Sequence, residues 1–273
     1  MPGRLKIDPA GTYLDGTAGG AGHSRQIALR LNGEQGGRLI SLDQDPDAVQ
    51  TARARLAGLP ATVVQINFRY AGQALEQLGI ETINGALLDL GVSSHQLDDA
   101  ARGFSYRADA PLDMRMSQEG ETAADLVNSE SREELARILR DYGEEPFAWQ
   151  IAGRIVEARE TVPIETTLQL ADIVASAMPP AERRKNKNPS RRTFQALRIA
   201  VNHELDALEE GLDTILRTSH RWKTLRDHLP LAGGPAGQKQ VPPLVHRLHL
   251  PAGVPGVRLR RQSQGKADHT QTH

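Results

Sequence analysis

Four short apolar runs, separated by segments with helical spacing, occupy the first third of the chain. They cover residues 12–14, 38–42, 61–66 and 83–88, and each leads into polar or glycine-rich sequence. Short apolar runs that alternate with helical segments indicate the buried strands of a parallel sheet. The pattern therefore predicts an α/β fold built on a doubly wound, Rossmann-like sheet. Such sheets bind ligands beyond the carboxyl ends of their strands.

The spacing of apolar residues becomes helical between residues 107 and 186, where no strand-like run occurs. One helix is predicted to begin at the capping-box sequence that starts with Ser131, a second near Phe147 and a third after Thr167. Their apolar stripes are typical of a hydrophobic core rather than of a catalytic site. The sequence thus predicts an all-helical domain inserted into the α/β domain.

The sequence DGTAGGAGHS, residues 15–24, follows the first predicted strand. Glycines in such a loop let a ligand approach the backbone closely. The dinucleotide fingerprint G-x-G-x-x-G is incomplete, because Arg25 stands where the third glycine would follow Gly20 and Gly22. An acid before the glycines and no Lys-Ser/Thr after them favour an adenosine ligand without phosphates, with S-adenosylmethionine as the leading candidate. The alternative is a turn that only links a strand to a helix.

Three residues at the ends of later strands are further candidates. Asp43 lies about 20 residues after the glycines, where Rossmann-like sheets bind the ribose hydroxyls, whereas Asp45 is expected to cap the next helix. Phe68 follows the third strand and is expected either to lie against an adenine or to belong to the core. Asp89 follows the fourth strand.

Composition narrows the class of protein. The chain has 273 residues, 38% of them hydrophobic, and a formal net charge of −1, so contact with nucleic acid would depend on local clusters of basic residues. It has no cysteine, so it has neither disulfides nor thiolate metal ligands, and we expect no metal site. No run is long and apolar enough to span a membrane, so we expect a soluble, cytoplasmic protein.

A basic run lies between residues 183 and 192, where six of ten residues are Lys or Arg and none is acidic. Such runs are commonly solvated surface. In a protein that binds RNA they also supply the salt-dependent part of the affinity, through contacts with phosphates. Both interpretations remain open.

The sequence DLGVSSHQLDDAARGFSYRADAPLDMRM, residues 89–116, resembles the signature of the bacterial 16S ribosomal RNA cytosine-N4 methyltransferase family. Residues 15–24, 42–48 and 191–205 agree with this resemblance. It implies a class I methyltransferase fold with a helical domain inserted after the fourth strand. It also implies S-adenosylmethionine as methyl donor, and as acceptor a cytosine in the decoding region of 16S ribosomal RNA, free or in the small ribosomal subunit.

The resemblance also assigns roles to individual residues. The family's cofactor-binding positions correspond to Ala21, Gly22, His23, Asp43, Phe68, Asp89 and Gln96. For catalysis we expect Asp89 to hold the hydrogens of the cytosine amine, which is a poor nucleophile and must be oriented toward the methyl group. The flipped base could stack on Phe104 or Tyr106, although both aromatics are equally expected in the core of the helical domain.

These expectations give a division into domains and two rival functions. Residues 1–106 are the first part of the methyltransferase domain, 107–186 the helical insertion, 187–218 the returning helix and 219–273 an irregular tail. One rival is a non-catalytic protein of RNA binding or ribosome assembly that keeps the same scaffold. The other is an NAD-dependent oxidoreductase, which the broken glycine fingerprint disfavours.

The tail differs from the rest of the chain. Residues 228–273 contain a single acid, Asp268, no aromatic residue and many prolines and glycines, so no core strand is expected there. The C-terminal part of the sheet is therefore predicted to be missing. Read one base later with plausible codons, residues 220–235 resemble the absent strand of the family. Our hypothesis is a frameshift near Thr218, which resequencing of the gene would test.

Overall fold

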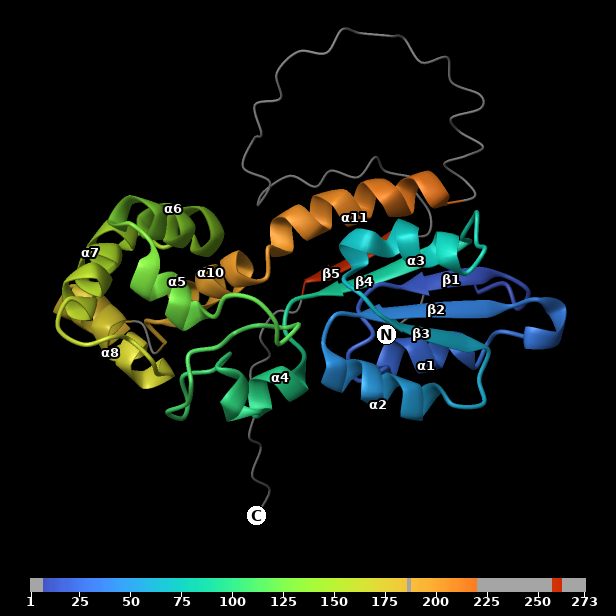
Figure 1. The fold of residues 1–273 in the computed structure, drawn as a ribbon, viewed down its shortest axis with the longest axis horizontal. Coiled ribbons are helices and arrows are strands. Elements are labelled where there is room, and N and C mark those ends of the chain that lie inside the picture. The colour runs from blue at the N-terminus through green and yellow to red at the C-terminus, as the bar shows by residue number, and fades with distance from the viewer. Residues whose placement is uncertain (1–6, 186–187, 220–256, 262–273) are drawn as a thin grey trace, which may run out of the picture. The chain divides into compact units, whose positions relative to one another are not determined.

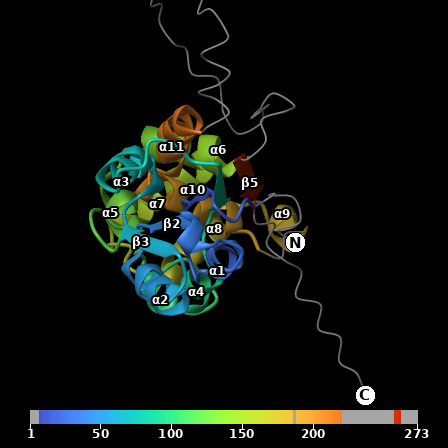
Figure 2. The same cartoon turned by 90° about the vertical axis from the view of Figure 1, so that its right-hand side faces the viewer.

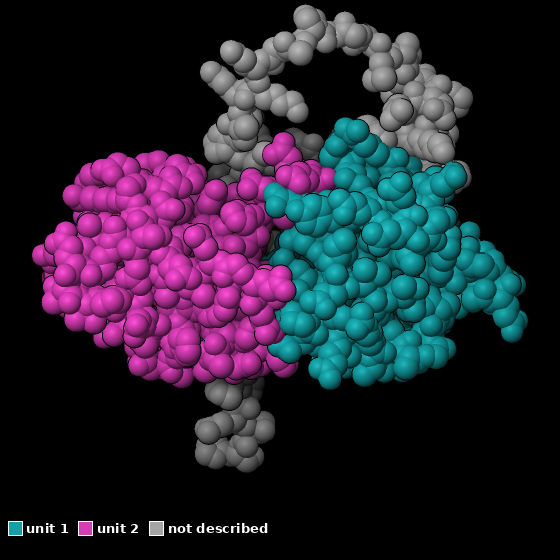
Figure 3. Space-filling view, viewed as in Figure 1, with its two compact units in different colours: residues 1–91, 211–230, 253–273 teal, residues 92–210, 231–252 magenta. Residues whose placement is uncertain are grey.

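A computed structural model describes residues 7–185, 188–219 and 257–261. The chain divides into two compact units, which Figure 3 shows in different colours. Among the described residues, the first unit holds 7–91, 211–219 and 257–261, and the second holds 92–185 and 188–210. The predicted domain boundary at 106/107 thus lies inside the second unit, as does the one at 186/187. No helix of the described part is long and apolar enough to cross a membrane.

The first unit is built on a parallel five-stranded sheet with the order β3-β2-β1-β4-β5. Its strands are β1 (Thr12–Asp15), β2 (Arg38–Asp43), β3 (Ala61–Gln65), β4 (Gly85–Leu90) and β5 (Val257–Arg261). The four strands expected from the apolar runs are all present, which confirms the Rossmann-like fold. The register pairs Asp15, the last residue of β1, with Ser41 of β2 and with Leu87 of β4, so the carboxyl ends of these parallel strands lie at the same edge of the sheet.

Helices cover both faces of this sheet, as Figures 1 and 2 show. On one face lie α1 (Gly22–Ala28) and α2 (Pro46–Leu56), and on the other α3 (Ala71–Gln77) and the part of α11 (Glu204–Thr218) that begins at Gly211. The short 3-10 helices η1 (Gly33–Gln35) and η2 (Phe68–Tyr70) complete the unit. Asp45 caps α2 by accepting a hydrogen bond from the Asp47 amide (3.1 Å), as expected.

Strand β5 corrects the expectation that the sheet lacks its C-terminal part. Val257 to Arg261 pair in parallel with Ala86 to Leu90 of β4. The composition of residues 228–273 as a whole argues against a strand, but a five-residue strand needs only a short segment, and VRLRR contains neither proline nor glycine. The rest of the irregular tail, including the frameshifted reading of residues 220–235, lies outside the described residues.

The second unit consists of helices and loops. In order along the chain they are α4 (Ser94–Asp98), η3 (Ala100–Arg102), α5 (Ala123–Ser129), α6 (Arg132–Gly143), α7 (Ala148–Arg159), α8 (Thr167–Ala177), α9 (Pro180–Lys185) and α10 (Arg191–Val201). Ser131 caps α6 as expected, but Glu134 pairs with Arg137 (2.5 Å) and does not close the predicted capping box. The box that opens α8 starts at Thr166, one residue earlier than expected.

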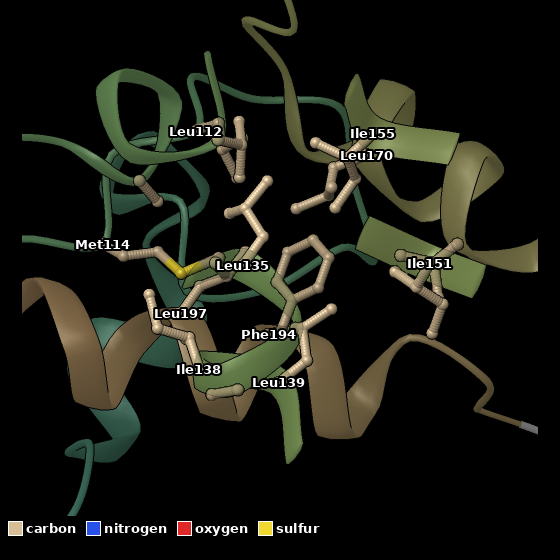
Figure 4. Close-up of a cluster of buried hydrophobic side chains, with 14 of the residues drawn as sticks. Leu112, Met114, Leu135, Ile138, Leu139, Ile151, Ile155, Leu170, Phe194 and Leu197 are labelled. Atoms are coloured by element: carbon tan, nitrogen blue, oxygen red, sulfur yellow. The ribbon is translucent and has the colours of Figure 1, made fainter. Parts of the chain in front are cut away.

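Apolar side chains from most of these helices form one core in the second unit. Figure 4 shows Phe194 of α10 among leucines and isoleucines of α6, α7 and α8. Phe104 is buried in this core, and Tyr106 packs edge to face on Phe194 with the ring centroids 4.8 Å apart. Phe104 therefore belongs to the core of the helical unit, and Tyr106 is half-buried against it. Helix α10, predicted to return to the first domain, instead packs with the helical unit because its apolar face carries Phe194 and Leu197.

Candidate functional site

The glycine loop between β1 and α1, residues 16–21, is the centre of the candidate site. The amide of Ala18 donates to the carbonyl of Leu42 (2.8 Å), which ties the loop to β2. Gly19 and Ala21 both have positive φ angles, 48° and 58°, and Ala21 is fully buried at the N-terminus of α1. A left-handed conformation is costly for alanine. The loop therefore holds a strained, defined shape, as loops that bind ligands commonly do.

Asp15 lies beneath this loop and is completely buried. One carboxylate oxygen accepts from the Ser24 hydroxyl (2.6 Å), which in turn lies 2.7 Å from the Ser41 hydroxyl, and the other accepts from the Thr17 amide (3.1 Å). Burial raises the pKa of Asp15 to about 7, against the opposing effect of these hydrogen bonds. The negative charges of Asp43 and Asp89 raise it further, so these two carboxylates lie close enough to act on Asp15.

Asp43 ends β2 and is already held in place by backbone amides. Its Oδ2 accepts from the amide of Gly19 (2.7 Å) and its Oδ1 from the amide of Asp45 (2.9 Å). Burial raises the pKa of Asp43, while these two hydrogen bonds lower it. Each oxygen keeps a second lone pair, so the side chain can accept further hydrogen bonds from a ligand.

Asp89 lies near the end of β4, next to the glycine loop. Its amide donates to the Thr17 hydroxyl oxygen (2.7 Å), and its Oδ2 lies 3.5 Å from His23 Nε2 of α1. Its Oδ1 is buried and has no hydrogen-bond partner among the side chains and backbone that the structure describes. An unsatisfied buried carboxylate oxygen is costly unless a ligand completes it. Asp89 therefore offers a free acceptor at the loop.

The other predicted site residues divide between the two units. Phe68 follows β3 in η2 and lies beside the loop, because a Cβ at Gly16 would stand 3.1 Å from the Cβ of Phe68. Gln96 belongs to the second unit, where it is buried and completes a capping box with Ser93 at the start of α4. The structure thus brings together Ala21, Gly22, His23, Asp43, Phe68 and Asp89, all in the first unit.

Sequence reasoning missed several residues that hold the loop. Arg55 of α2 donates to the carbonyl of Gly20 (2.5 Å), and Thr17 links the loop to Asp89. Ser24 and Ser41 sit on buried faces and bind Asp15 through a chain of hydroxyls. A polar residue within an otherwise apolar strand, as Ser41 is, was the available signal. Arg55 had none, since it is one of two arginines in the last turn of α2.

The geometry fits S-adenosylmethionine in two respects. A Cβ built on Gly19 or Gly22 would meet nothing within 4 Å, so open space lies above the loop. The carboxylates of Asp43 and Asp89 beside the loop suit a sulfonium cation better than a pyrophosphate. No group of three or more His, Cys, Asp or Glu in the described ranges could hold a metal ion.

Comparison with known proteins decides the family. Residues 3–221, which include the whole loop and both Asp43 and Asp89, match the MraW methylase family. The chain belongs to this family. Three relatives carry the name "Ribosomal RNA small subunit methyltransferase H". The one from Heliobacterium modesticaldum is 54% identical over 216 residues, 78% of this chain and 68% of the relative.

The other two relatives give the same result for this MraW family member. The protein from Lachnospira eligens is 52% identical over 215 residues, 78% of this chain and 68% of its own length. The protein from Deinococcus deserti is 52% identical over 228 residues, 82% of this chain and 73% of its own length. The family resemblance seen in the sequence is therefore confirmed. The family match ends at residue 221, three residues after the proposed frameshift near Thr218.

Proposed function

We propose that this chain transfers a methyl group from S-adenosylmethionine to the exocyclic N4 of a cytosine in the decoding region of 16S ribosomal RNA, in the cytoplasm. The observation that carries the proposal is the convergence of Asp43, Asp89 and His23 on the glycine loop of a MraW family member. Relatives named as small-subunit ribosomal RNA methyltransferases support the substrate class.

Each of the site residues has a proposed role toward the cofactor. Asp43 accepts hydrogen bonds from the ribose hydroxyls, and Phe68 lies against the adenine. Ala21, Gly22 and His23 form the rim of the loop around the methionine portion. Asp89 and Gln96 are the remaining residues proposed to bind the cofactor, and Asp89 also contacts the methyl acceptor.

Catalysis by this chain is a matter of position and charge. The bound cofactor supplies an activated methyl group on its sulfonium. The lone pair of the cytosine amine is delocalised into the ring, so the amine must be held in line with that methyl group. The Asp89 carboxylate accepts a hydrogen bond from N4 and stabilises the positive charge that N4 gains.

Methyl transfer to small subunits tests this function. The substrate is small ribosomal subunits from cells that lack the corresponding methyltransferase, incubated with this chain and S-adenosylmethionine labelled in its methyl group. Nucleoside analysis should recover the label in N4-methylcytidine. Binding of RNA without transfer would instead support the non-catalytic rival. A parallel assay on free 16S ribosomal RNA shows which form of the RNA is the substrate.

Replacing Asp43 by alanine is expected to weaken cofactor binding. The ribose hydroxyls lose a charged acceptor, and hydrogen bonds to charged groups contribute about 1.5–3 kcal/mol. The dissociation constant for S-adenosylmethionine should therefore rise about tenfold to a hundredfold, as measured by calorimetry. The loop also loses the contact between Asp43 and the Gly19 amide, which acts in the same direction.

Two variants control for this experiment. Asp43→Asn keeps an acceptor oxygen but loses the charge, so its affinity should fall between those of the wild type and Asp43→Ala. Glu76→Ala removes an exposed acid of α3 and should leave affinity unchanged. Unaltered affinity in Asp43→Ala would refute the ribose assignment.

The basic run at α9 and the start of α10 is proposed to contact RNA phosphates. Arg183, Arg184, Arg191 and Arg192 are exposed, whereas Lys187 lies outside the described residues. Replacing Arg183, Arg184, Lys185 and Lys187 by alanine should weaken RNA binding and flatten its dependence on salt, while cofactor affinity stays the same. Filter binding across a range of KCl concentrations measures this, and an unaltered slope would identify the run as solvated surface.

A further inference from the structure

Methylation of an amine releases a proton, and the site must dispose of it. This inference rests on the proposed function, because it concerns the N4 amine of the acceptor. When the N4 lone pair forms a bond to the methyl carbon, the bond from that carbon to sulfur breaks and its electron pair stays on sulfur. N4 then carries a positive charge until one of its protons leaves. A buried site needs an acceptor for that proton and a route from the acceptor to water.

Of the three carboxylates at the strand ends, Asp89 is the one suited to accept. Both oxygens of Asp15 are occupied by Ser24 and Thr17, and the side chain has no access to solvent. Both oxygens of Asp43 accept hydrogen bonds from backbone amides. Asp89, in contrast, accepts no side-chain hydrogen bond from an amide or a hydroxyl in the described part of the chain: its Oδ1 has no partner, and its Oδ2 faces His23 from a side chain that is 14% exposed.

His23 lies next to Asp89 and is the more exposed of the two side chains. Its Nε2 lies 3.5 Å from Asp89 Oδ2, and the two side chains are 33% and 14% exposed, respectively. The distance is longer than a hydrogen bond, but such contacts in the absence of substrate commonly shorten when the substrate is bound. The imidazole is thus the more exposed member of a pair whose other member is buried.

We propose that Asp89 and His23 form a proton relay, in which Asp89 accepts the proton released from N4 and His23 passes it to water. The proton moves from N4 to Asp89 Oδ2, the carboxylate oxygen that faces His23, as the new bond forms. Oδ2 then passes this proton to Nε2 of the neutral imidazole, whose own proton is on Nδ1. The imidazolium gives its Nδ1 proton to water, and proton exchange with water moves the remaining proton from Nε2 back to Nδ1 before the next turnover.

His23 has two proposed roles, binding of the cofactor and transfer of a proton. Kinetic measurements can separate these roles, whereas sequence comparison cannot. A residue that only binds the cofactor affects the dissociation constant, and saturating cofactor restores the rate. A relay residue affects the rate of transfer at saturating cofactor and responds to pH. Asp15 and Asp43 also lie near this site. Any effect of their protonation on the rate should be the same in the wild type and in variants at position 23, so the difference between the two pH profiles reports on His23.

The test is single-turnover methyl transfer to small subunits by the full chain at saturating S-adenosylmethionine, between pH 6 and pH 9. His23→Gln keeps a polar side chain that cannot carry a proton, and its rate should fall at least about tenfold. The wild-type rate should decline as the pH is lowered, because a protonated imidazole cannot accept a proton. The rate of His23→Gln should lack that part of the decline. Added imidazole should restore part of the rate of His23→Ala.

One control and three outcomes decide the matter. The control is His95→Gln, which alters an exposed histidine of α4 and should behave as the wild type does. A normal rate for His23→Gln at saturating cofactor would overturn the relay, as would a reduced rate with an unchanged pH profile and no rescue by imidazole. If the wild type itself transfers no methyl group, the proposed function fails and the relay falls with it.

Discussion

Replacing Asp89 by asparagine is expected to lower the rate of methyl transfer at saturating S-adenosylmethionine by about a hundredfold or more, the usual contribution of a positioned proton acceptor. The substitution preserves the size of the side chain and the hydrogen bond from its backbone amide to Thr17. It removes the negative charge next to N4 and replaces one carboxylate oxygen with an NH₂ group, which cannot accept a proton.

Separate measurements of rate and affinity distinguish the two roles of Asp89. Single-turnover kinetics give the rate, and calorimetry gives the dissociation constant for the cofactor. Asp98→Asn, at an exposed acid of α4, provides the matched control. If Asp89→Asn transfers methyl groups at the wild-type rate once the cofactor is saturating, then Asp89 contributes only to binding.

The stability of the first unit is expected to decrease as the pH rises, because of Asp15. Its pKa is about 7 in the folded protein and near 3.8 when exposed, so between these values the folded state holds a proton that the unfolded state has released. The unfolding free energy therefore falls between about pH 4 and pH 7 and is lowest above pH 7. At about 1.4 kcal/mol per pH unit, the expected loss is of the order of 4 kcal/mol.

Urea unfolding of the wild type and of Asp15→Asn, followed by circular dichroism at pH 5 and pH 8, measures this effect. The wild type should be less stable at pH 8, and the difference between the two pH values should be much smaller in Asp15→Asn. Burial also raises the pKa of Asp43, so a smaller trend of the same sign should remain in the variant. Equal trends in both proteins would show that Asp15 titrates normally.

The strands and the site loop were predictable because their signals are local. Each strand from β1 to β4 is a short apolar run, and Asp43 and Asp89 follow such runs directly. Parallel strands place their carboxyl ends at one edge, so the meeting of these acids with the glycine loop follows from the topology. The role of Asp45 as the cap of α2 was also predictable, because Pro46 and Asp47 follow it.

Features that depend on distant residues were not predictable from local sequence. Arg55 reaches Gly20 across 35 positions, and Thr17 reaches Asp89 across 72. Nothing near either residue in the sequence indicates these partners. Strand β5 also depends on a distant partner. Its five residues pair with β4, although the average composition of the segment around them argues against a strand. Packing of Phe194 likewise decides which unit contains α10.

The two amide hydrogen bonds that hold Asp43 bear on the selection of cofactor analogues. The carboxylate is fixed by Gly19 and Asp45 before any ligand arrives, so binding requires little loss of side-chain freedom. The same rigidity prevents the carboxylate from turning toward another donor when a hydroxyl is missing. Each oxygen keeps its amide, but the lone pairs that the ribose would have used are then buried without a donor, which lowers affinity by more than the lost hydrogen bond contributes. Analogues with a deoxyribose in place of the ribose should therefore be discriminated against strongly.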